Sequence, residues 1–312
     1  MLLFLDRLSA ATARGPVTPW LPAHFWIRPN AASATPPTAL LLHGILGSAR
    51  NIRTLATQLA ARLPHWQWLL VDLRSHGDSR GAPPPHTIGA CVADLEALCR
   101  HLGVAPTAVI GHSFGGKVAL ELATPQSGPA WPELRSVWAL DTQPHLTAAQ
   151  DLGHGAVNHG AASTVIAAIR RCPGPFASRN AMTDQLVAQG QSAGVAQWMT
   201  TNLTQQADGL VWRFELPGVE QLLNSYFEVD SWPVLAAPAE GVTVHMLRAG
   251  REPRWTPDIT ERLERTAHPR LHLHVLANAG HWVHVDDLLG LLAMLTADLG
   301  TLQYPPRSRL PL

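Results

Sequence analysis

The chain has 312 residues, of which 15% are charged, and its 23 basic side chains balance 23 acidic ones. This length is enough to bury a sizeable core, and a neutral, apolar-rich composition argues against a disordered protein. Without a basic surplus, the sequence also argues against a dedicated nucleic-acid-binding protein.

The sequence predicts no metal centre, disulfide framework or membrane span. The three cysteines, Cys91, Cys99 and Cys172, match no zinc-binding spacing, and the 16 histidines are scattered along the chain. No apolar run approaches the roughly 18 residues that a membrane-spanning helix needs. Residues 1–15 lack the charged n-region of a secretory signal. We therefore expect a soluble protein of the cytoplasm or of an organelle, without a metal or cofactor.

The first half of the chain alternates predicted strands with predicted helices. Four short apolar segments bounded by turn residues are typical of strands buried on both faces of a parallel sheet. These strands are expected at 38–44, 66–73, 107–113 and 134–141. Apolar residues at helical spacing predict helices over 49–63, 88–102 and 114–124. This succession of βαβ units predicts an α/β fold with a doubly wound, mostly parallel sheet.

The alternation stops after Asp141 and returns near residue 241. We expect a helical cap, inserted after the strand that ends near Asp141, to cover a site at the carboxyl ends of the strands. The expected cap helices are 161–171, 184–191 and 195–207. The later core elements are strands at 241–250 and 271–281 and helices at 257–267 and 285–298.

These patterns divide the chain into four parts. Residues 38–143 and 236–300 are expected to form the α/β core, and 144–235 the helical cap. Residues 1–37 are expected to be an N-terminal extension with the first strand or strands. The proline-broken residues 301–312 are expected to be a frayed tail.

The segment Gly111-His112-Ser113-Phe114-Gly115 carries the strongest catalytic signal. A G-x-S-x-G segment between a strand and a helix is typical of a nucleophile elbow, in which a sharp bend lifts the serine hydroxyl above the sheet. The following helix directs its positive end at this hydroxyl. The sequence therefore predicts Ser113 as a nucleophile and the Phe114 N–H as an oxyanion donor. The alternative is a glycine-rich turn with a capping serine.

A serine hydroxyl needs a base and a site that stabilises the oxyanion. His281 follows the last predicted strand, at the same edge of the sheet as Ser113, and is the predicted base. The loop His43–Ser48 follows the first core strand, and its Ile45 N–H is the predicted second oxyanion donor. The residues predicted to contact substrate flank these groups: His43, Gly44, His112 and Trp282.

Two acids are candidates for orienting the histidine. Glu252 lies in the loop after the penultimate strand, and Asp141 ends an earlier strand. Either order places an acid between the serine and the histidine in the chain. The alternatives are that Asp141 caps the turn into the cap and that Glu252 pairs with Arg251 or Arg254.

The motifs HGILGS, DLRSHGDS, GHSFGGK and AGHWVH together resemble the α/β-hydrolase family. More narrowly, they resemble its small esterase branch, which holds bacterial acyl-ester and acyl-CoA hydrolases and organellar relatives. The resemblance spans nearly residues 38–300 and includes the cap segment Leu210–Phe214. Several members of the branch place the acid at the position of Asp141, and some of them have serine at that of Glu252. The resemblance therefore favours Asp141, although this chain has acids at both positions.

The branch also has a lysine at the position of Lys117. We expect this lysine on the surface of the helix after Ser113; the alternative is that it lends positive potential near the site. Arg74 and His76 match a loop motif that braces the floor of the active site, and we expect them to be structural.

The resulting prediction is a serine hydrolase that cleaves carboxylic esters or thioesters of small or acyl-chain substrates through an acyl-enzyme on Ser113. One alternative is a non-catalytic or weakly catalytic small-molecule receptor on the same fold. The other is a carbon–carbon bond hydrolase or cofactor-free haloperoxidase. Apolar cap residues predict an acyl pocket, unless they fill the core of the cap: Trp198, Met199, Leu203, Trp212, Phe214, Leu222, Leu223, Tyr226 and Phe227.

Overall fold

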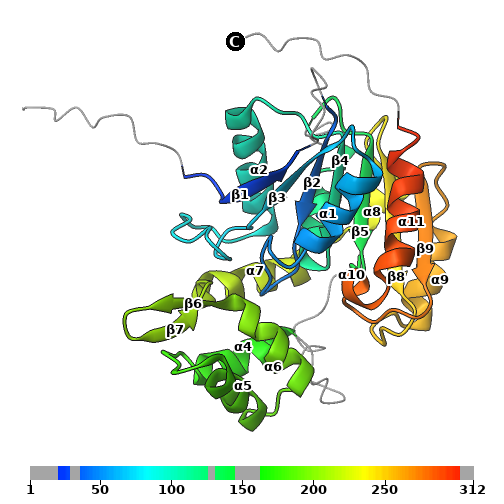
Figure 1. Ribbon diagram of the computed structural model, residues 1–312. Coiled ribbons are helices and arrows are strands. Elements are labelled where there is room, and N and C mark those ends of the chain that lie inside the picture. The colour runs from blue at the N-terminus through cyan, green and yellow to red at the C-terminus, as the bar shows by residue number, and fades with distance from the viewer. Residues whose placement is uncertain (1–19, 29–35, 126–130, 145–161, 303–312) are drawn as a thin grey trace, which may run out of the picture.

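The computed structural model describes residues 20–28, 36–125, 131–144 and 162–302. Its main sheet has seven strands in the order β1-β3-β2-β4-β5-β8-β9 (Figure 1). Only β1 runs antiparallel to its neighbour, so the predicted doubly wound, mostly parallel sheet is confirmed. The strands are β1 (His24–Ile27), β2 (Thr38–Leu42), β3 (Gln67–Val71), β4 (Ala108–His112), β5 (Ser136–Leu140), β8 (Thr243–Ala249) and β9 (Leu271–Leu276).

Helices cover both faces of the sheet, because every residue of β2 to β5 is buried and must be packed on both sides. On one face α2 and α3 pack through Leu95 and Val118, together with α8 and α9. On the other face α1 and α11 pack through Leu59 and Leu295. These helices and the short α10 are α1 (Arg53–Arg62), α2 (Ile88–Leu102), α3 (Phe114–Glu121), α8 (Trp232–Ala236), α9 (Pro257–Arg265), α10 (Val283–Asp286) and α11 (Leu288–Leu299).

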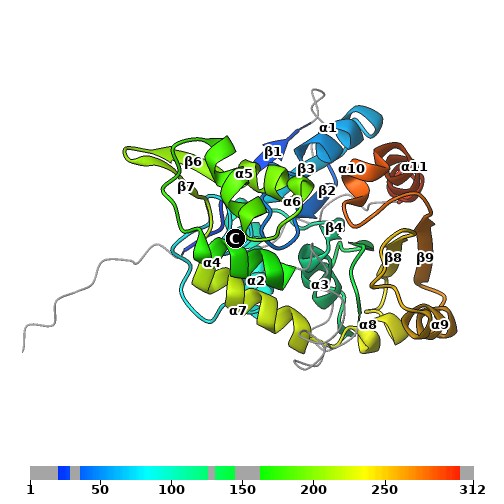
Figure 2. The same ribbon diagram turned by 90° about the horizontal axis from the view of Figure 1, so that it is seen from below.

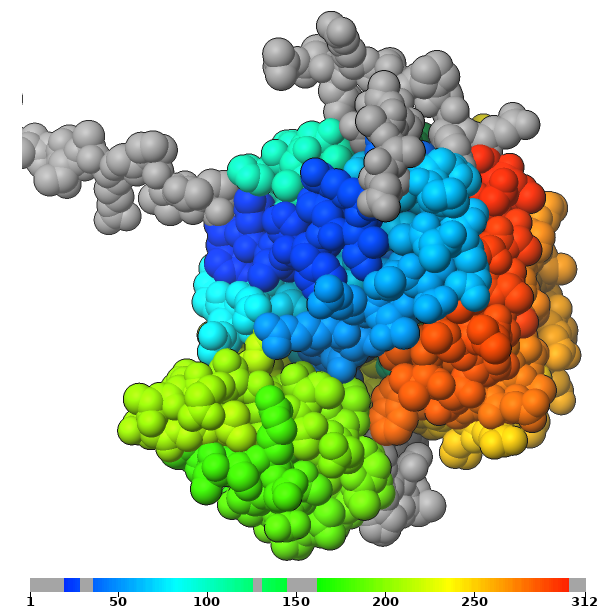
Figure 3. All heavy atoms as spheres, viewed as in Figure 1, coloured from blue at the N-terminus to red at the C-terminus, as the bar shows by residue number. Residues whose placement is uncertain are grey.

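Residues 162–228, which we call the cap, form a separate lobe between β5 and β8 in the chain (Figure 3). Figures 1 and 2 place the cap toward the β1–β3 side of the core. Its apolar cluster includes Ile169 and Met182 and is joined by Leu46 from the loop after β2. Its elements are α4 (Ala162–Arg171), α5 (Arg179–Ala188), α6 (Ala193–Met199), a 3₁₀ turn (Thr200–Asn202), β6 (Leu203–Gln206), β7 (Gly209–Trp212) and α7 (Leu216–Glu228).

The expectation of a helix over 195–207 is wrong in its second half, where β6 and β7 form an antiparallel hairpin. The first residue of β7, Gly209, has φ 131°, a conformation that residues with a side chain rarely adopt. Phe176 and Leu210 also exchange two main-chain hydrogen bonds of 2.8 Å, which stabilise the extended chain. The α5 helix begins earlier than expected because Ser178 caps it and accepts a hydrogen bond from Ala181 N–H.

Parts of all four predicted segments lie outside the described residues. These parts are residues 1–19 and 29–35 of the expected extension, 126–130 of the expected core, 145–161 of the expected cap and 303–312 of the expected tail. The strand β1 falls inside the expected extension. Near the end of the expected cap, α8 packs its Val234 and Leu235 into the core cluster. Among the helices of the described ranges, none is both long and apolar enough to cross a membrane.

Candidate active site

Ser113 lies on a tight bend between β4 and α3. Its backbone has φ 52° and ψ −113°, and its N–H donates to Leu140 O at 2.8 Å. The neighbouring glycines make this bend possible. A Cβ on Gly111 would lie 2.1 Å from Gly115 O, and a Cβ on Gly115 would lie 2.5 Å from His43 O. The bend therefore puts Ser113 at the carboxyl edge of the sheet, at the first turn of α3.

His281 lies in the loop between β9 and α10, next to this bend. His112 Nε2 donates to the carbonyl oxygen of His281 at 2.7 Å, and the two rings are 4.8 Å apart. The ring of His284 lies 4.9 Å from that of His112. Because His112 directly precedes Ser113, these contacts hold the His281 loop beside the serine. His112, which the sequence assigned to substrate contact, thus anchors the backbone of His281.

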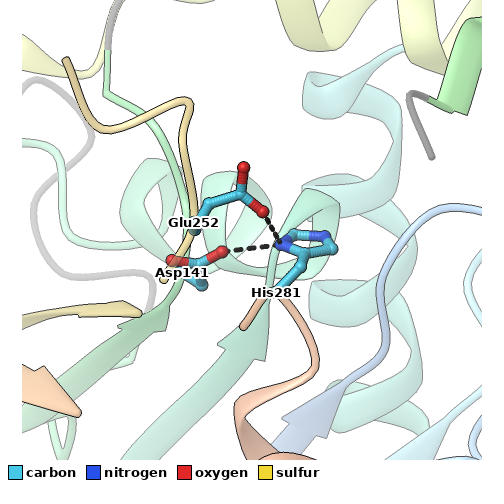
Figure 4. Close-up of side chains that lie close together, drawn as sticks. All are labelled: Asp141, Glu252 and His281. Atoms are coloured by element: carbon cyan, nitrogen blue, oxygen red, sulfur yellow. Dashed lines mark hydrogen bonds and ion pairs between the residues drawn. The ribbon is translucent and has the colours of Figure 1, made fainter. Parts of the chain in front are cut away.

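Asp141 is the acid that reaches His281. Its Oδ2 lies 2.6 Å from His281 Nδ1 (Figure 4). Its Oδ1 accepts hydrogen bonds from Ala249 N–H at 2.8 Å and from Trp255 Nε1–H at 2.7 Å. The side chain is 1% exposed, and the backbone is left-handed at φ 49°. The carboxylate is thus fixed by two donors and faces the imidazole with its other oxygen.

Glu252 approaches the same nitrogen but is bound elsewhere. Its Oε2 lies 3.9 Å from His281 Nδ1, beyond hydrogen-bond distance. Instead, Arg254 binds the carboxylate through Nε at 2.8 Å and Nη2 at 3.0 Å. Burial alone would raise the pKa of Glu252, but the hydrogen bonds and charge of Arg254 outweigh burial and lower it. Glu252 is therefore an ionised partner of Arg254.

The cluster of Asp141, Glu252 and His281 also offers ligand atoms within 4.8 Å of one another, a spacing that a metal ion could bridge. Its contacts favour proton transfer instead. Both oxygens of Glu252 bind Arg254, and the guanidinium Nη2 lies 2.8 Å from His281 Nδ1. A cation at this position would have to compete with a positive charge already there.

The loop that carries Ile45 is packed against the serine bend. A Cβ on Gly44 would lie 3.4 Å from Ser113 Cβ, and the next residue but one, Leu46, has a left-handed backbone at φ 58°. Leu46 N–H donates to His76 Nε2 at 3.0 Å. The main chain around Ile45 is therefore held rigidly beside Ser113, as an oxyanion-binding loop requires.

His43 has a structural position rather than an open one. It is 1% exposed; its Nε2 accepts from Leu73 N–H at 2.9 Å, and its Nδ1 lies 2.8 Å from Gly44 O. Asp72 joins the same loops, accepting from Ala49 N–H at 2.7 Å and Asp78 N–H at 2.8 Å. These contacts leave no ring nitrogen of His43 for a substrate and tie the loops after β2 and β3 together.

Acid should weaken this buried network. Burial lowers the pKa of His43 to about 4 and that of His76 to about 3, from an ordinary 6.5. In the unfolded chain these two histidines take up protons as pH falls below 6.5, whereas in the folded chain they stay neutral until pH approaches their lowered pKa values. The stability that the neutral network gives the fold is therefore complete above pH 6.5 and is lost as pH falls below it. When pH falls from 7 to 5, each of the two imidazoles should lower the free energy of unfolding by about 2 kcal/mol.

Urea unfolding of the wild type and His76→Gln at both pH values measures this effect. The glutamine retains an acceptor for Leu46 N–H but does not titrate. The difference in the free energy of unfolding between pH 7 and pH 5 should therefore be about 2 kcal/mol smaller in His76→Gln than in the wild type. His101→Gln, an exposed position in α2, is the matched control and should leave the difference unchanged. An equal change in both variants would contradict the assignment to His76.

Lys117 is buried, so the expectation of a surface lysine is wrong. All residues of α3 from Phe114 to Leu120 are buried, because the helix lies between the sheet and neighbouring helices that include α7. Lys117 Nζ donates to Tyr226 O at 2.6 Å and lies 4.2 Å from the centre of the Tyr226 ring. Burial lowers the pKa of Lys117 to about 8. The residue thus connects α3, the helix after Ser113, to α7 of the cap.

Most apolar cap residues expected to line a pocket instead fill apolar cores. Among them Met199, Leu203, Trp212, Phe214, Leu222, Leu223 and Tyr226 are buried. Trp198 and Phe227 are only partly buried. The Trp198 ring lies 5.5 Å from that of Trp282, the residue after His281. The cap therefore contacts the loop that carries His281 through this tryptophan pair.

A parallel sheet with a serine on the bend after its middle strand, and a histidine–carboxylate pair at the same edge, defines a hydrolase of the α/β type. Comparison with known proteins agrees: the chain belongs to the alpha/beta hydrolase family, which it matches over residues 39–292. The protein is therefore a hydrolase, and the resemblance found in its motifs is confirmed.

Three relatives illustrate this family. The sn-1-specific diacylglycerol lipase ABHD11 of Mus musculus is 29% identical over 271 residues, covering 85% of this chain and 82% of the relative. Esterase YbfF of Escherichia coli is 26% identical, covering 79% of this chain and 87% of the esterase. A solved marine microorganism esterase has the same fold, with a TM-score of 0.70 and 19% identity, covering 88% of this chain and 99% of that one.

Proposed function

We propose that this protein hydrolyses carboxylic esters or thioesters through an acyl-enzyme on Ser113, with His281 as the base and Asp141 as its acid partner. One observation carries the proposal. Asp141 Oδ2 lies 2.6 Å from His281 Nδ1, and His112 holds the loop that carries His281 beside the Ser113 bend. A carboxylate at Nδ1 keeps the proton there and leaves Nε2 free to accept a proton from a serine hydroxyl.

The proposed reaction has two halves. Ser113 Oγ attacks the acyl carbon as His281 takes its proton, and the Phe114 and Ile45 N–H groups stabilise the oxyanion. His281 then protonates the leaving alcohol or thiol as its bond to the acyl carbon breaks. In the second half His281 activates a water molecule, which attacks the acyl carbon. The carboxylic acid leaves and Ser113 regains its proton.

Two observations support an acyl ester as the substrate class. The matched relatives include a lipase and an esterase over about four-fifths of this chain. The partly buried Trp198, Phe227, Ile45 and Trp282 each pack against the apolar cluster of the cap, and the rings of Trp198 and Trp282 lie 5.5 Å apart. Such surfaces suit an alkyl chain better than a charged acyl group, because apolar contact is favourable and burial of an unpaired charge is costly.

A fluorophosphonate probe tests the catalytic serine directly. The wild-type protein should become labelled, and peptide mapping should place the adduct on Ser113, because only an activated serine attacks the phosphorus atom. Ser113→Ala should not be labelled. A panel of p-nitrophenyl esters and acyl-CoAs of graded chain length then defines the leaving group and the acyl chain. A wild-type protein that binds these compounds but resists the probe would favour the receptor alternative.

A further inference from the structure

Two oppositely charged side chains, Glu252 and Arg254, lie beside the Asp141–His281 pair. Arg254 Nη2 is 2.8 Å from His281 Nδ1, the same nitrogen that lies 2.6 Å from Asp141 Oδ2. A guanidinium only donates hydrogen bonds, and an Nδ1–H that donates to Asp141 has no lone pair to accept one. When Nδ1 carries its proton, Arg254 therefore makes no hydrogen bond with the ring. It acts on the imidazole through its positive charge alone.

The position of Arg254 is fixed by its surroundings. Its side chain binds both oxygens of Glu252, and its main-chain N–H donates to Glu252 Oε1 at 3.1 Å. Its main-chain oxygen accepts a hydrogen bond from the Gln143 amide. The next residue, Trp255, donates to Asp141. The loop after β8 thus presents a bound acid–base pair to His281 together with the donor that orients Asp141.

We infer that Arg254 is a positioning residue that neutralises Glu252, so that this pair leaves the pH range in which His281 works as a base to the contact of His281 with Asp141. This inference rests on the proposed role of His281. Arg254 opposes the imidazolium that forms when Ser113 loses its proton, and Glu252 offsets Arg254. The pair adds no net charge, so a site with two acids presents the charge of one carboxylate to His281.

The other titratable groups near this site do not explain a difference between the variants, because each is either neutral or present in every variant. Burial lowers the pKa of His112 well below its usual range and that of His284 to about 4. Burial raises the pKa of Tyr226 to about 12. Asp286 of α10 binds Gly280 N–H at 2.8 Å, next to His281 in the chain. The charges that the experiment varies are therefore those of Glu252 and Arg254.

The two single variants should move the acid limb of the kcat/KM–pH profile in opposite directions. Arg254→Gln removes a positive charge, stabilises the imidazolium and should move the limb up by about one pH unit. Glu252→Gln leaves Arg254 unopposed and should move the limb down by about one unit, with a several-fold lower plateau. The double variant Glu252→Gln/Arg254→Gln should return the limb to within about 0.3 units of the wild type.

Two further variants separate charge from structure. Arg254→Lys keeps the charge and should keep the limb at its wild-type position. Arg251→Gln removes a positive charge from the same loop, where the side chain contacts Asn278 and not His281, and should cause no shift. Shifts in the same direction for both single variants, or a double variant that fails to return, would overturn the inference.

Failure of the inference differs from failure of the proposed function. If Ser113→Ala is inactive and neither single variant moves the limb, the serine mechanism stands and the pair has no role in it. If Ser113→Ala keeps wild-type activity, the hydrolytic mechanism itself is wrong, and the pH profile reports some other group. The same purified full-length proteins and a single p-nitrophenyl ester serve for every measurement.

Discussion

Replacing Ser113 with alanine is expected to lower kcat/KM for ester hydrolysis by at least about 10,000-fold. The alanine leaves the bend, the loop after β2 and the cap intact but removes the oxygen atom that the proposed acyl-enzyme requires. Residual hydrolysis then depends on water attacking the bound ester. Steady-state rates with a short p-nitrophenyl ester, together with a thermal melt to confirm folding, provide the measurement.

The same reasoning predicts strong non-additivity. His281→Ala alone should cost about as much as Ser113→Ala, because an unactivated hydroxyl is a poor nucleophile. The double variant should be no worse than Ser113→Ala, since each substitution removes the same proton-transfer step. Losses that multiply across the two positions would show that Ser113 and His281 act independently, contrary to the proposed mechanism.

The sheet and the serine bend could be predicted because their signals are local. Buried parallel strands require continuous apolar runs, and a strand-to-helix bend with a nucleophile requires small residues on both sides of it. The predicted strand at 107–113 and helix at 114–124 match β4 and α3, with Ser113 between them. Because Asp141 and His281 both follow predicted strands of a parallel sheet, the sequence also placed them at the same edge, where the structure finds them in contact.

The features that the sequence did not predict depend on contacts between segments far apart in the chain. Lys117 was expected on the helix surface but is buried, because α7 covers the helix that carries it. His43 and His76 belong to motifs, yet their role in joining the loops after β2 and β3 follows only from the folded chain. Arg254 was foreseen as a partner of Glu252, but its contact with His281 requires the loop after β8 to meet the loop after β9.

The choice between the two acids yields the second large prediction. Asp141→Asn should lower kcat by about 1,000- to 10,000-fold, or about 4 to 5.5 kcal/mol, whereas Glu252→Gln should cost less than about tenfold at the pH optimum. The reason lies in the two donors that bind Asp141. Ala249 N–H and Trp255 Nε1–H both need an acceptor at the Oδ1 position. An asparagine must therefore place its carbonyl oxygen there and direct its NH₂ group at His281 Nδ1.

An NH₂ group at Nδ1 turns that nitrogen into an acceptor and moves the ring proton to Nε2, where it blocks removal of the serine proton. Glu252 should not replace the lost carboxylate, because Arg254 binds both of its oxygens, through Nε at 2.8 Å and through Nη2 at 3.0 Å. Asp141→Asn should keep the wild-type melting temperature to within a few degrees, since both donors remain satisfied. Full activity of Asp141→Asn combined with a large loss in Glu252→Gln would reverse the assignment and make Glu252 the acid of this site.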